Sequence, residues 1–423
     1  MELRPIKPIQ VCAHWQGLKD PQLMGILNVS FSRGKEIFSF EYDEVWLKTH
    51  GQELDPDLAL YAGPQYARDE HANFGIFLDS SPDRWGRVLM QRREAQLARS
   101  EKRPVKNLLE SDFLLGVFDK HRMGALRFRL SEKGPFLDNN KDMASPPWAQ
   151  LRDLEYASNQ LEKDNAETQK DYMKWLHMLI APGGSLGGAR PKASVIDPAG
   201  NLWIAKFPSE MDEVNSGAWE YVLYLLAIDS GIEMAEAKMQ QFSGRHHTFL
   251  TKRFDRTNNG ERLHFASAMT LLGKKDGDDY LTGASYLDLV NFIIQKGAET
   301  NRDLEQLWRR IVFNICVSNV DDHLRNHGFL LKQNGWILSP AFDMNPSATG
   351  NGLTLNISEV DNSQNLDLVM EVAAEFRIKK ERAKEIIYAV KKSVNRWRKI
   401  AKKAGIKNSE IELMQNAFRL TID

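Results

Sequence analysis

The stretch from Ser318 to Pro346, SNVDDHLRNHGFLLKQNGWILSPAFDMNP, constrains the fold of this chain more than any other. Two short apolar runs, Phe329–Leu331 and Trp336–Leu338, are separated by a segment that contains Asn334-Gly335, a strong signal for a β-hairpin turn. A hairpin of this length returns the chain to its starting point. The carboxylate after the second run is therefore predicted to lie close to the loop before the first.

Three polar residues of this stretch suit divalent-metal chemistry on a polyphosphate. Asp321 and Asn326 have the Asp-x-x-x-x-Asn spacing of the protein-kinase catalytic loop, in which the aspartate orients a hydroxyl nucleophile and the asparagine holds metal. Asp343 then stands where the kinase metal-binding aspartate stands, although the local sequence is FDM and not DFG. Mg²⁺ prefers hard oxygen ligands and leaves room for phosphate oxygens. Aspartate and asparagine are also common in turns, so the loop alone has a structural reading as well.

A glycine-rich segment, APGGSLGGARPKASVIDPAGNLWIAKFPS, lies upstream and contains a predicted strand pair, Ala193–Ile196 and Leu202–Phe207. Glycines let backbone N–H groups approach a phosphate closely, and Lys206 on the returning strand can reach the same phosphates. No GK[ST] opens a helix, so the segment does not match a P-loop ATPase. A flexible surface turn would explain the glycines alone. The glycines of the loop are Gly183, Gly184, Gly187 and Gly188.

The next segments continue in the order of a protein kinase. Glu213–Ser230 is a predicted helix closed by Gly231, with Glu220 in its apolar middle. Lys206 is the obvious cation for Glu220 and would reproduce the lysine–glutamate pair of kinases, unless Glu220 faces solvent. A predicted strand, Thr248–Phe254, stands where a kinase-like fold places the strand and hinge beneath the adenine. This order of motifs is more specific than any one of them.

The residues before the glycine-rich segment are predicted to form a separate module. Runs such as Met24–Phe31 and Ile37–Phe40 flank a turn of hairpin length, and Ser80 or Ser81 is a plausible N-cap for a helix with Pro82 in its first turn. A loop-like stretch over 131–147 then reads as a linker. The predicted organisation is 1–131 for this module, 148–255 for an ATP-binding small-lobe region and 256–423 for a helical lobe with the catalytic and metal loops.

Composition excludes several classes of protein. Hydrophobic residues make up 42% of the chain, charged residues 27%, and the formal net charge is -1, so nothing global indicates a nucleic-acid or membrane partner. Only two cysteines occur, Cys12 and Cys316, which argues against a disulfide framework or zinc site and fits a reducing cytoplasm. The N-terminus lacks an apolar signal core, and the longest strongly apolar stretch, Tyr221–Ile228, is too short to span a bilayer. We expect a soluble cytoplasmic protein.

One local surface is strongly basic. The stretch Arg377–Lys407 is crowded with lysine and arginine, and apolar residues stripe it at helical spacing. Its basic face could touch a nucleic-acid backbone or an acidic partner, although a solvated helix face is the simpler reading.

Taken in order, the motifs resemble the HipA-type serine/threonine kinases, toxins of bacterial type II toxin–antitoxin modules. The resemblance covers nearly the whole chain. The motifs that carry it are SPDRWGR (Ser81–Arg87), SLGGARPKA (Ser185–Ala193), IAKFP (Ile204–Pro208), WEYVLYLLAIDSGI (Trp219–Ile232), KRFDR (Lys252–Arg256), NVDDHLRN (Asn319–Asn326) and AFDMNP (Ala341–Pro346). Two positions depart from the family pattern: Lys252 replaces a common glutamate of the hinge, and Arg325 a common lysine of the catalytic loop.

The resemblance implies an α+β, two-lobed protein-kinase-like fold with an N-terminal β-rich subdomain and a mainly helical C-terminal lobe. It implies phosphorylation of a protein hydroxyl by ATP and Mg²⁺, with Asp321 as the catalytic aspartate and Asn326 and Asp343 as metal ligands. His323 follows the family pattern and reads first as a structural or loop-orienting residue. The residues expected around the nucleotide are Ser185, Gly187, Gly188, Lys206, Glu220, Phe254 and His323.

The same resemblance implies a regulatory serine and a set of partners. Family members can autophosphorylate a serine of the phosphate loop, which ejects the loop and switches the kinase off. Ser185 stands at that position, unless it only binds phosphate or caps a turn. The implied partners are a HipB-like helix-turn-helix antitoxin, DNA reached through that antitoxin, and an aminoacyl-tRNA synthetase as the default substrate. The alternatives are a catalytically silent ATP-binding co-repressor and a small-molecule kinase.

Overall fold

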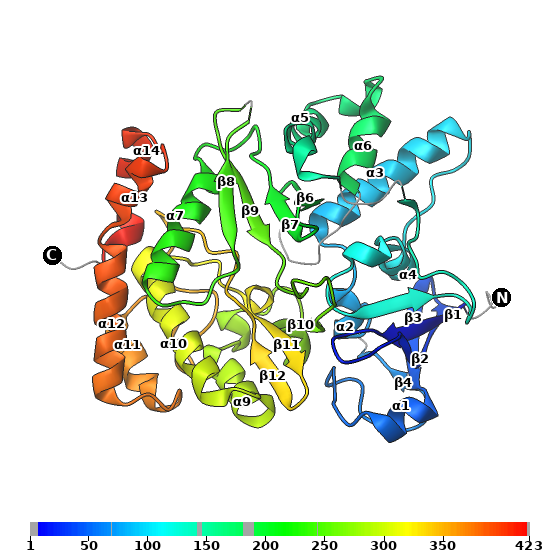
Figure 1. Cartoon of the computed structure of the whole chain (residues 1–423), viewed down its shortest axis with the longest axis horizontal. Helices are drawn as coiled ribbons and strands as arrows, with labels where there is room; N and C mark the ends of the chain where they lie inside the picture. The colour runs from blue at the N-terminus through cyan, green and yellow to red at the C-terminus, as the bar shows by residue number, and fades with distance from the viewer. Residues whose placement is uncertain (1–6, 69, 142–145, 181–189, 243, 421–423) are drawn as a thin grey trace. The chain divides into compact units, whose positions relative to one another are not determined.

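A computed structural model of the chain describes residues 7–68, 70–141, 146–180, 190–242 and 244–420 (Figure 1). The chain divides into two compact units. The first unit contains Met1–Glu210 and Arg253–Ala266, and the second contains Met211–Lys252 and Ser267–Asp423. Within the described ranges, no helix is both long and apolar enough to cross a membrane.

The N-terminal part of the first unit is a five-stranded sheet, as the β-rich pattern predicts. Its strands are β1 (Lys7–Ala13), β2 (Gln22–Ser32), β3 (Lys35–Tyr42), β4 (Gln65–Tyr66) and β5 (Leu126–Arg129), in the antiparallel order β4-β3-β2-β1-β5. The predicted β2–β3 hairpin is confirmed. Ser32 pairs with Lys35, and Arg33 and Gly34 take positive φ angles of 50° and 82°, as in the type I′ turn that suits a twisted hairpin.

The first unit also contains six α-helices within the described residues. They are α1 (Glu44–Thr49), α2 (Gly75–Asp79), α3 (Arg84–Ser100), α4 (Glu110–Leu115), α5 (Leu151–Glu162) and α6 (Tyr172–Ile180), and α6 packs against both α3 and α5 (Figure 1). The predicted N-cap of α3 was wrong. The cap is Asp83, whose side chain accepts a hydrogen bond from Gly86 N at 2.8 Å, whereas the Ser80 and Ser81 hydroxyls donate to carbonyls one turn back.

The predicted strand pair after the glycine-rich loop is also confirmed. It consists of β6 (Lys192–Ile196) and β7 (Leu202–Lys206), which run antiparallel with Lys192 opposite Lys206. The carboxylate of Asp197 shapes the turn between them by accepting hydrogen bonds from the backbone N–H groups of Ala199 and Asn201 at 2.9 and 2.8 Å.

The second unit contains a helix predicted around Glu220, namely α7 (Ser216–Asp229). Asn215 caps its first turn, and Gly231, at a φ of 79°, follows its C-terminal end. The other elements are β8 (Ala237–Gln240), β9 (Thr248–Lys252), α8 (Ala268–Leu271), α9 (Tyr286–Lys296), α10 (Thr300–Val317), β11 (Gly328–Lys332), β12 (Gly335–Leu338), α11 (Leu366–Glu371), α12 (Lys380–Val394), α13 (Trp397–Lys403) and α14 (Asn408–Leu413). The strand β10 (Phe265–Ser267) spans the point in the sequence where the chain passes from the first unit to the second.

Packing in the second unit places α12 against both α7 and α10, and α13 against α7 (Figure 1). The apolar stripe of the basic stretch supplies this contact, because Val390, Val394 and Trp397 are buried. The lysines of the stretch lie on the other side, and Lys380, Lys384, Lys392 and Lys399 are exposed. The two-faced character predicted from the sequence is therefore present.

The hairpin predicted from the apolar runs Phe329–Leu331 and Trp336–Leu338 is formed by β11 and β12. Phe329 pairs with Leu338 and Lys332 with Gly335, so Gln333 and Asn334 make the turn. Gly335 has a φ of 134°, and a Cβ built on it would lie 2.4 Å from the carbonyl oxygen of Lys296. Both the backbone angle and the close approach require glycine.

Replacing Gly335 with alanine is expected to lower the free energy of unfolding by more than the about 1–3 kcal/mol that strained backbone alone costs, because the opposing group is a backbone carbonyl. Urea denaturation would measure this. Gly277→Ala is the matched control, since Gly277 also has a positive φ, 95°, but a Cβ added there would meet no heavy atom within 4 Å. Equal losses in the two variants would contradict the steric explanation.

Candidate functional site

The loop that carries Asp321 begins where α10 ends. Ser318 terminates the helix with a left-handed φ of 49°, and Asn319 then donates from Nδ2 to Asn314 Oδ1 at 3.0 Å. The Oδ1 atom of Asn319 accepts a hydrogen bond from the backbone N–H of Asn345 at 3.1 Å. The start of the loop is thus tied directly to the segment that carries Asp343, as the hairpin argument predicts.

The buried carboxylate of Asp322 anchors this loop to the surrounding helices by hydrogen bonds. Asp322 is 3% exposed, and its Oδ2 accepts hydrogen bonds from Tyr286 Oη at 2.6 Å and Asn314 Nδ2 at 2.8 Å. His327 Nε2 lies 2.9 Å from the same oxygen. Burial raises the pKa of the Asp322 carboxyl, but His327 and these hydrogen bonds outweigh it, so the pKa lies below its ordinary value. The carboxylate therefore stays ionised and anchors the loop.

Removing one of these donors gives a stability prediction. Tyr286→Phe is expected to lower the free energy of unfolding by about 1.5–3 kcal/mol, the usual contribution of a hydrogen bond to a charged group. Thermal or urea unfolding would measure the loss. Tyr388→Phe, at a side chain 61% exposed on α12, should leave stability unchanged. A loss of the same size at Tyr388 would mean that the Asp322 contact is not the cause.

Asp321 itself is exposed at the surface of the loop. Desolvation by the surrounding protein raises the pKa of its carboxyl above the ordinary value, His323 opposes this, and the neighbouring Asp343 and Asp322 carboxylates add to it. The charges of Asp321 and Asp343 therefore repel one another across the loop. A cation between them would relieve this repulsion.

Asn326 offers an unused oxygen to such a cation. Its Nδ2 donates to the backbone carbonyl of Asp321 at 2.9 Å, which fixes the amide, while its buried Oδ1 has no hydrogen-bond partner among the residues that the structure describes. Buried polar atoms are rarely left unpaired, and an unpaired one indicates a missing ligand or a functional role. The amide is thus oriented with an acceptor free.

Asp343 has an unusual backbone conformation. Its φ is 58°, in the left-handed region, and its Oδ1 accepts a hydrogen bond from Asn345 Nδ2 at 3.3 Å. A non-glycine residue held in that region costs about 1–3 kcal/mol, and such residues gather at functional sites.

The oxygen atoms of Asp321, Asn326 and Asp343 match the ligand type that Mg²⁺ prefers, so the residues present fit this ion. Among the described residues, no group of three or more His, Cys, Asp or Glu side chains is arranged to hold a metal. Two carboxylates and one amide do not complete an octahedron. Phosphate oxygens or water would have to supply the remaining positions, as is usual for Mg²⁺ in phosphoryl-transfer sites.

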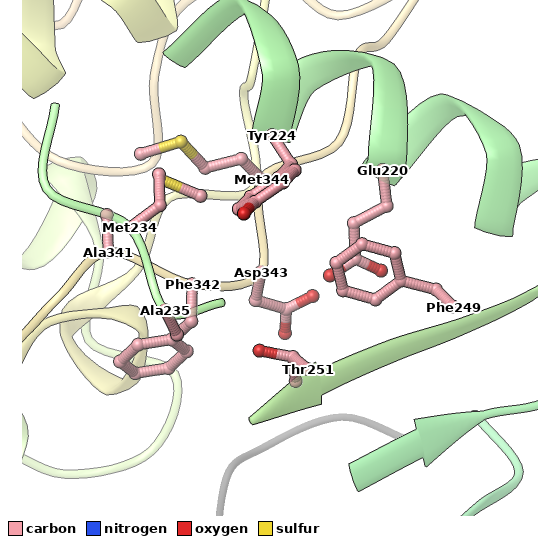
Figure 2. Close-up of a pocket in the computed structure, with 10 residues that line it drawn as sticks. All are labelled: Glu220, Tyr224, Met234, Ala235, Phe249, Thr251, Ala341, Phe342, Asp343 and Met344. Atoms are coloured by element: carbon pink, nitrogen blue, oxygen red, sulfur yellow. The ribbon is translucent and has the colours of Figure 1, made fainter. Parts of the chain in front are cut away.

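Asp343 also lines a pocket of the second unit together with Glu220 and Tyr224 of α7 and Thr251 of β9 (Figure 2). Figure 2 shows the carboxylates of Glu220 and Asp343 both pointing into this pocket. The cavity is small, about 10 Å³, room for little more than a water molecule. Glu220 is only 6% exposed, so the alternative that it simply faces solvent was wrong. Nothing in the sequence pattern had indicated Thr251.

The remaining predicted nucleotide residues lie elsewhere in the chain. Lys206 ends β7 and is half-buried in the first unit, whereas Glu220 belongs to the second, so their pairing remains a prediction. Phe254 is half-buried in the first unit. His323 contributes to the electrostatics of Asp321, and its buried Nδ1 has no hydrogen-bond partner within the described ranges. Three predicted residues fall outside the described ranges: Ser185, Gly187 and Gly188.

A buried ion pair between the N-terminus of α3 and the start of β6 was not predicted. Lys192, at the start of β6, places its Nζ 2.9 Å from Asp83 Oδ2, and the two side chains are 5% and 1% exposed. Asp83 thus has two tasks, because it also caps α3. The SPDRWGR motif therefore fixes the strand that follows the loop. The only signal for this in the sequence was the motif itself.

Comparison with known proteins gives three findings. Residues 184–397 match the model of the HipA-like C-terminal domain. A Haemophilus influenzae protein named "Putative kinase" is 26% identical over 180 residues, which is 38% of this chain and 52% of that protein, so the match spans about half of the relative's length. A HipA structure from Shewanella oneidensis MR-1, solved as a complex of HipA, HipB and operator DNA, has a TM-score of 0.63 at 16% identity, over 97% of this chain and 94% of that chain.

The Shewanella match confirms the predicted fold class, a mixed helix-and-sheet HipA-like architecture. The proinflammatory kinase CtkA of Helicobacter pylori is also similar, with a TM-score of 0.34 at 14% identity over 50% of this chain and 94% of that chain.

Proposed function

The chain belongs to the family of HipA-like C-terminal domains, and on that premise we propose that it is a Mg²⁺- and ATP-dependent serine/threonine-protein kinase. In this proposal it is the toxin of a HipA/HipB-like toxin–antitoxin module in the cytoplasm. The observation that carries the proposal is the buried Oδ1 of Asn326, which has no hydrogen-bond partner among the described residues, in the same loop as Asp321, whose carboxylate and that of Asp343 repel one another. That arrangement suits a cation that carries a polyphosphate.

Each residue then has a defined task. Asn326 and Asp343 would hold Mg²⁺, which would supply neutralisation of the charge on the phosphates. Asp321 accepts a hydrogen bond from the substrate hydroxyl, orients it, and takes its proton as a weak base. Lys206 contacts the ATP phosphates and pairs with Glu220, the loop around Gly187 and Gly188 covers the phosphates, and Phe254 borders the adenine.

The partners follow from the same proposal. The Shewanella HipA occurs in a complex with HipB and operator DNA, which supports a HipB-like helix-turn-helix antitoxin and an indirect link to DNA for this chain. The proposed substrate is an aminoacyl-tRNA synthetase or another protein of translation. Autophosphorylation of Ser185 is the proposed off-switch.

Intact-mass spectrometry after incubation with Mg²⁺ and ATP tests this function. The wild type, first shown to be unphosphorylated, is expected to gain one phosphate at Ser185, and Asp321→Asn to gain none. Ser185→Ala separates the two claims, because it should lose the added mass yet still phosphorylate a supplied synthetase. A wild type that neither gains mass nor transfers phosphate to any synthetase would remove the kinase assignment.

A catalytically silent, ATP-binding co-repressor is the second candidate. The basic and exposed lysines of α12 and α13 favour it, since such a face attracts a nucleic-acid backbone. DNA binding by the chain without any antitoxin, weakening steeply as salt rises, would support this reading. Retention of Asp321, Asn326 and Asp343 together argues against it, because a silent protein does not need all three.

A further inference from the structure

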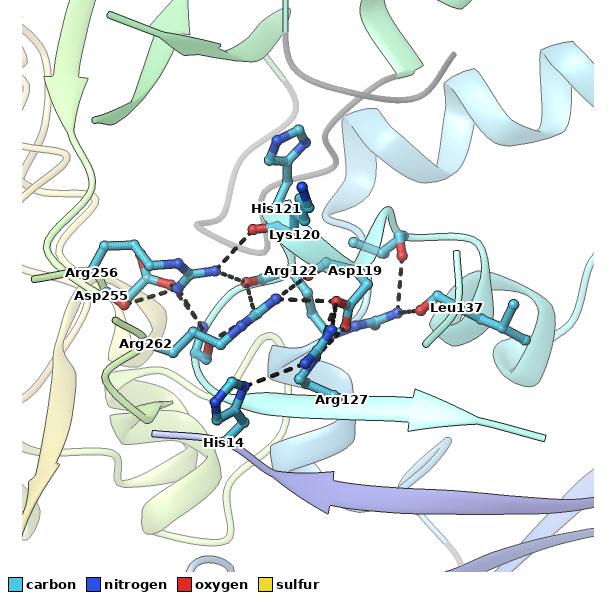
Figure 3. Close-up of polar contacts among 12 residues, drawn as sticks. His14, Asp119, Lys120, His121, Arg122, Arg127, Leu137, Asp255, Arg256 and Arg262 are labelled. Atoms are coloured by element: carbon cyan, nitrogen blue, oxygen red, sulfur yellow. Dashed lines mark hydrogen bonds and ion pairs between the residues drawn. The ribbon is translucent and has the colours of Figure 1, made fainter. Parts of the chain in front are cut away.

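The segment Arg253–Ala266 is held in the first unit by a cluster of buried charged side chains (Figure 3). Three arginines of this segment, Arg253, Arg256 and Arg262, donate to backbone carbonyls of residues 119–124, which connect α4 to β5. Backbone carbonyls offer fixed acceptors, and the guanidinium group is a rigid fork of donors. The segment and this connection are therefore locked together in one arrangement.

Asp255 is the centre of the cluster. It is fully buried, and its Oδ1 accepts from Arg253 Nε at 2.9 Å. Its Oδ2 accepts from Arg253 Nη2 and Arg256 Nη1, both at 2.6 Å, and from the backbone N–H of Gly124 at 2.8 Å. Burial raises the pKa of the carboxyl, but Arg253 and Arg256 outweigh this and lower it to about 2. Asp255 is thus ionised and fully hydrogen-bonded.

Gly124 allows the close approach on the other side of this contact. Its φ is 70°, and a Cβ added to it would lie 3.2 Å from the backbone nitrogen of Phe265. A side chain at this position would push the two segments apart. The donors of Arg253, Arg256 and Arg262 face protein acceptors, so the cluster reads as a structural lock and not as a site for a free anion.

The hydrogen-bonded residues Arg253 and Asp255 flank one aromatic residue, Phe254. Arg253 and Asp255 are buried, and Phe254, which lies between them where the chain bends just after β9, is half-buried. The Phe254 ring lies 5.9 Å from that of Phe265, at an interplanar angle of 51°. Because the side chains of both neighbours are held by hydrogen bonds, the backbone on either side of Phe254 is restrained.

We infer that Arg253 and Asp255 are positioning residues that aim the Phe254 ring at the adenine of ATP. This inference rests on the proposed function, in which Phe254 borders the adenine. A planar ring held at one angle offers a face on which a base can stack, and a ring that moves loses part of that contact. Arg253 and Asp255 therefore act on the nucleotide through Phe254 and not by touching its phosphates.

The inference has a second consequence for the N-terminal residues. The acceptors and the Gly124 N–H that complete the lock belong to the 119–124 connection, far from Phe254 in sequence. Selectivity for adenine thus depends on residues well before the glycine-rich loop.

A binding experiment with two Mg²⁺-loaded probes, ATP and inorganic tripolyphosphate, tests the inference in the full chain. Tripolyphosphate has the phosphates but no adenine. Asp255→Asn is expected to weaken ATP binding by about threefold to tenfold, the contribution of one aromatic contact, and to leave the Kd of tripolyphosphate unchanged. Isothermal titration calorimetry gives both constants. Phe254→Leu, which leaves the lock intact, should show the same selective loss.

Two further variants keep the test decisive. Glu110→Gln is the matched control, because it makes the same carboxylate-to-amide change in the first unit at a residue paired with Arg87 at 2.6 Å, away from Asp255. It should leave the ratio of the two Kd values unchanged. Arg253→Lys keeps the charge but loses the fork, and it replaces Asp255→Asn if the latter does not fold.

The outcomes separate the inference from the function on which it rests. Equal weakening of both probes in Asp255→Asn or Arg253→Lys, or an unaltered ratio in Phe254→Leu, would overturn the positioning role while the kinase proposal stands. A wild type that binds tripolyphosphate and ATP equally would also overturn it. A wild type that binds neither probe would overturn the proposed function, and the inference with it.

Discussion

Replacing Asp321 with asparagine is expected to lower phosphoryl transfer by about 10²–10⁴-fold, the usual contribution of a positioned general base. Asparagine has nearly the same size but cannot take the proton of the substrate hydroxyl. The loop should persist, because Asn326 bonds to the backbone carbonyl of Asp321 and not to its side chain. The measurement is the rate of ³²P transfer from labelled ATP to protein, together with the unfolding midpoint of each variant.

Asp367→Asn provides the control for this experiment. Asp367 is an exposed aspartate in the first turn of α11, in the same unit, and the same substitution there should leave the rate unchanged. If Asp321→Asn turned over as fast as Asp367→Asn, Asp321 would have no part in the reaction. If its unfolding midpoint fell as well, the loss of rate would reflect a damaged loop.

The second large effect is expected on stability. Asp83→Ala should lower the free energy of unfolding by about 3–5 kcal/mol, since it leaves the Lys192 ammonium buried without its carboxylate. Loss of the α3 cap adds about 1 kcal/mol. Urea denaturation, followed by a probe in the first unit, would measure the change.

The double variant Asp83→Asn/Lys192→Met tests the cause. It removes both buried charges and keeps an asparagine at the cap position, so its stability should lie much closer to that of the wild type. A double variant as unstable as Asp83→Ala would show that the ion pair is not the source of the loss.

Local signals in the sequence predicted the local structure well. The hairpin signalled by Asn334-Gly335, the pair β6 and β7, and the helix around Glu220 each depend on residues close together in the chain, and all three elements are present, although the hairpin turns at Gln333 and Asn334. Helix interruptions were harder to predict. Between α5 and α6, for example, Asn165 adopts a left-handed φ of 59°, which local helical patterning does not indicate.

Long-range contacts explain most of what the sequence did not reveal. Asp322 was passed over in favour of its neighbour Asp321, because its role depends on Tyr286 and Asn314, which come from α9 and α10. Asp83 and Lys192 are likewise far apart in the chain. The catalytic spacing from Asp321 to Asn326 could be predicted, since it lies within one loop, but the unpaired Oδ1 of Asn326 could not. Whether that oxygen finds a hydrogen-bond partner depends on the orientation of the Asn326 amide, which only the folded structure determines.

The passage of Arg253–Ala266 into the first unit affects the order in which the protein can fold during synthesis. Nascent domains usually fold as soon as they leave the ribosome, N-terminal first, at about 5–20 residues per second. Here the first unit is incomplete at residue 210 and lacks Asp255 until the segment ending at Ala266 has emerged. That wait lasts roughly 3–11 s at these rates, during which Met211–Lys252 is already exposed. The polar acceptors of the 119–124 connection must remain unsatisfied or hydrated for those seconds, which makes this interval the natural point for a chaperone to act.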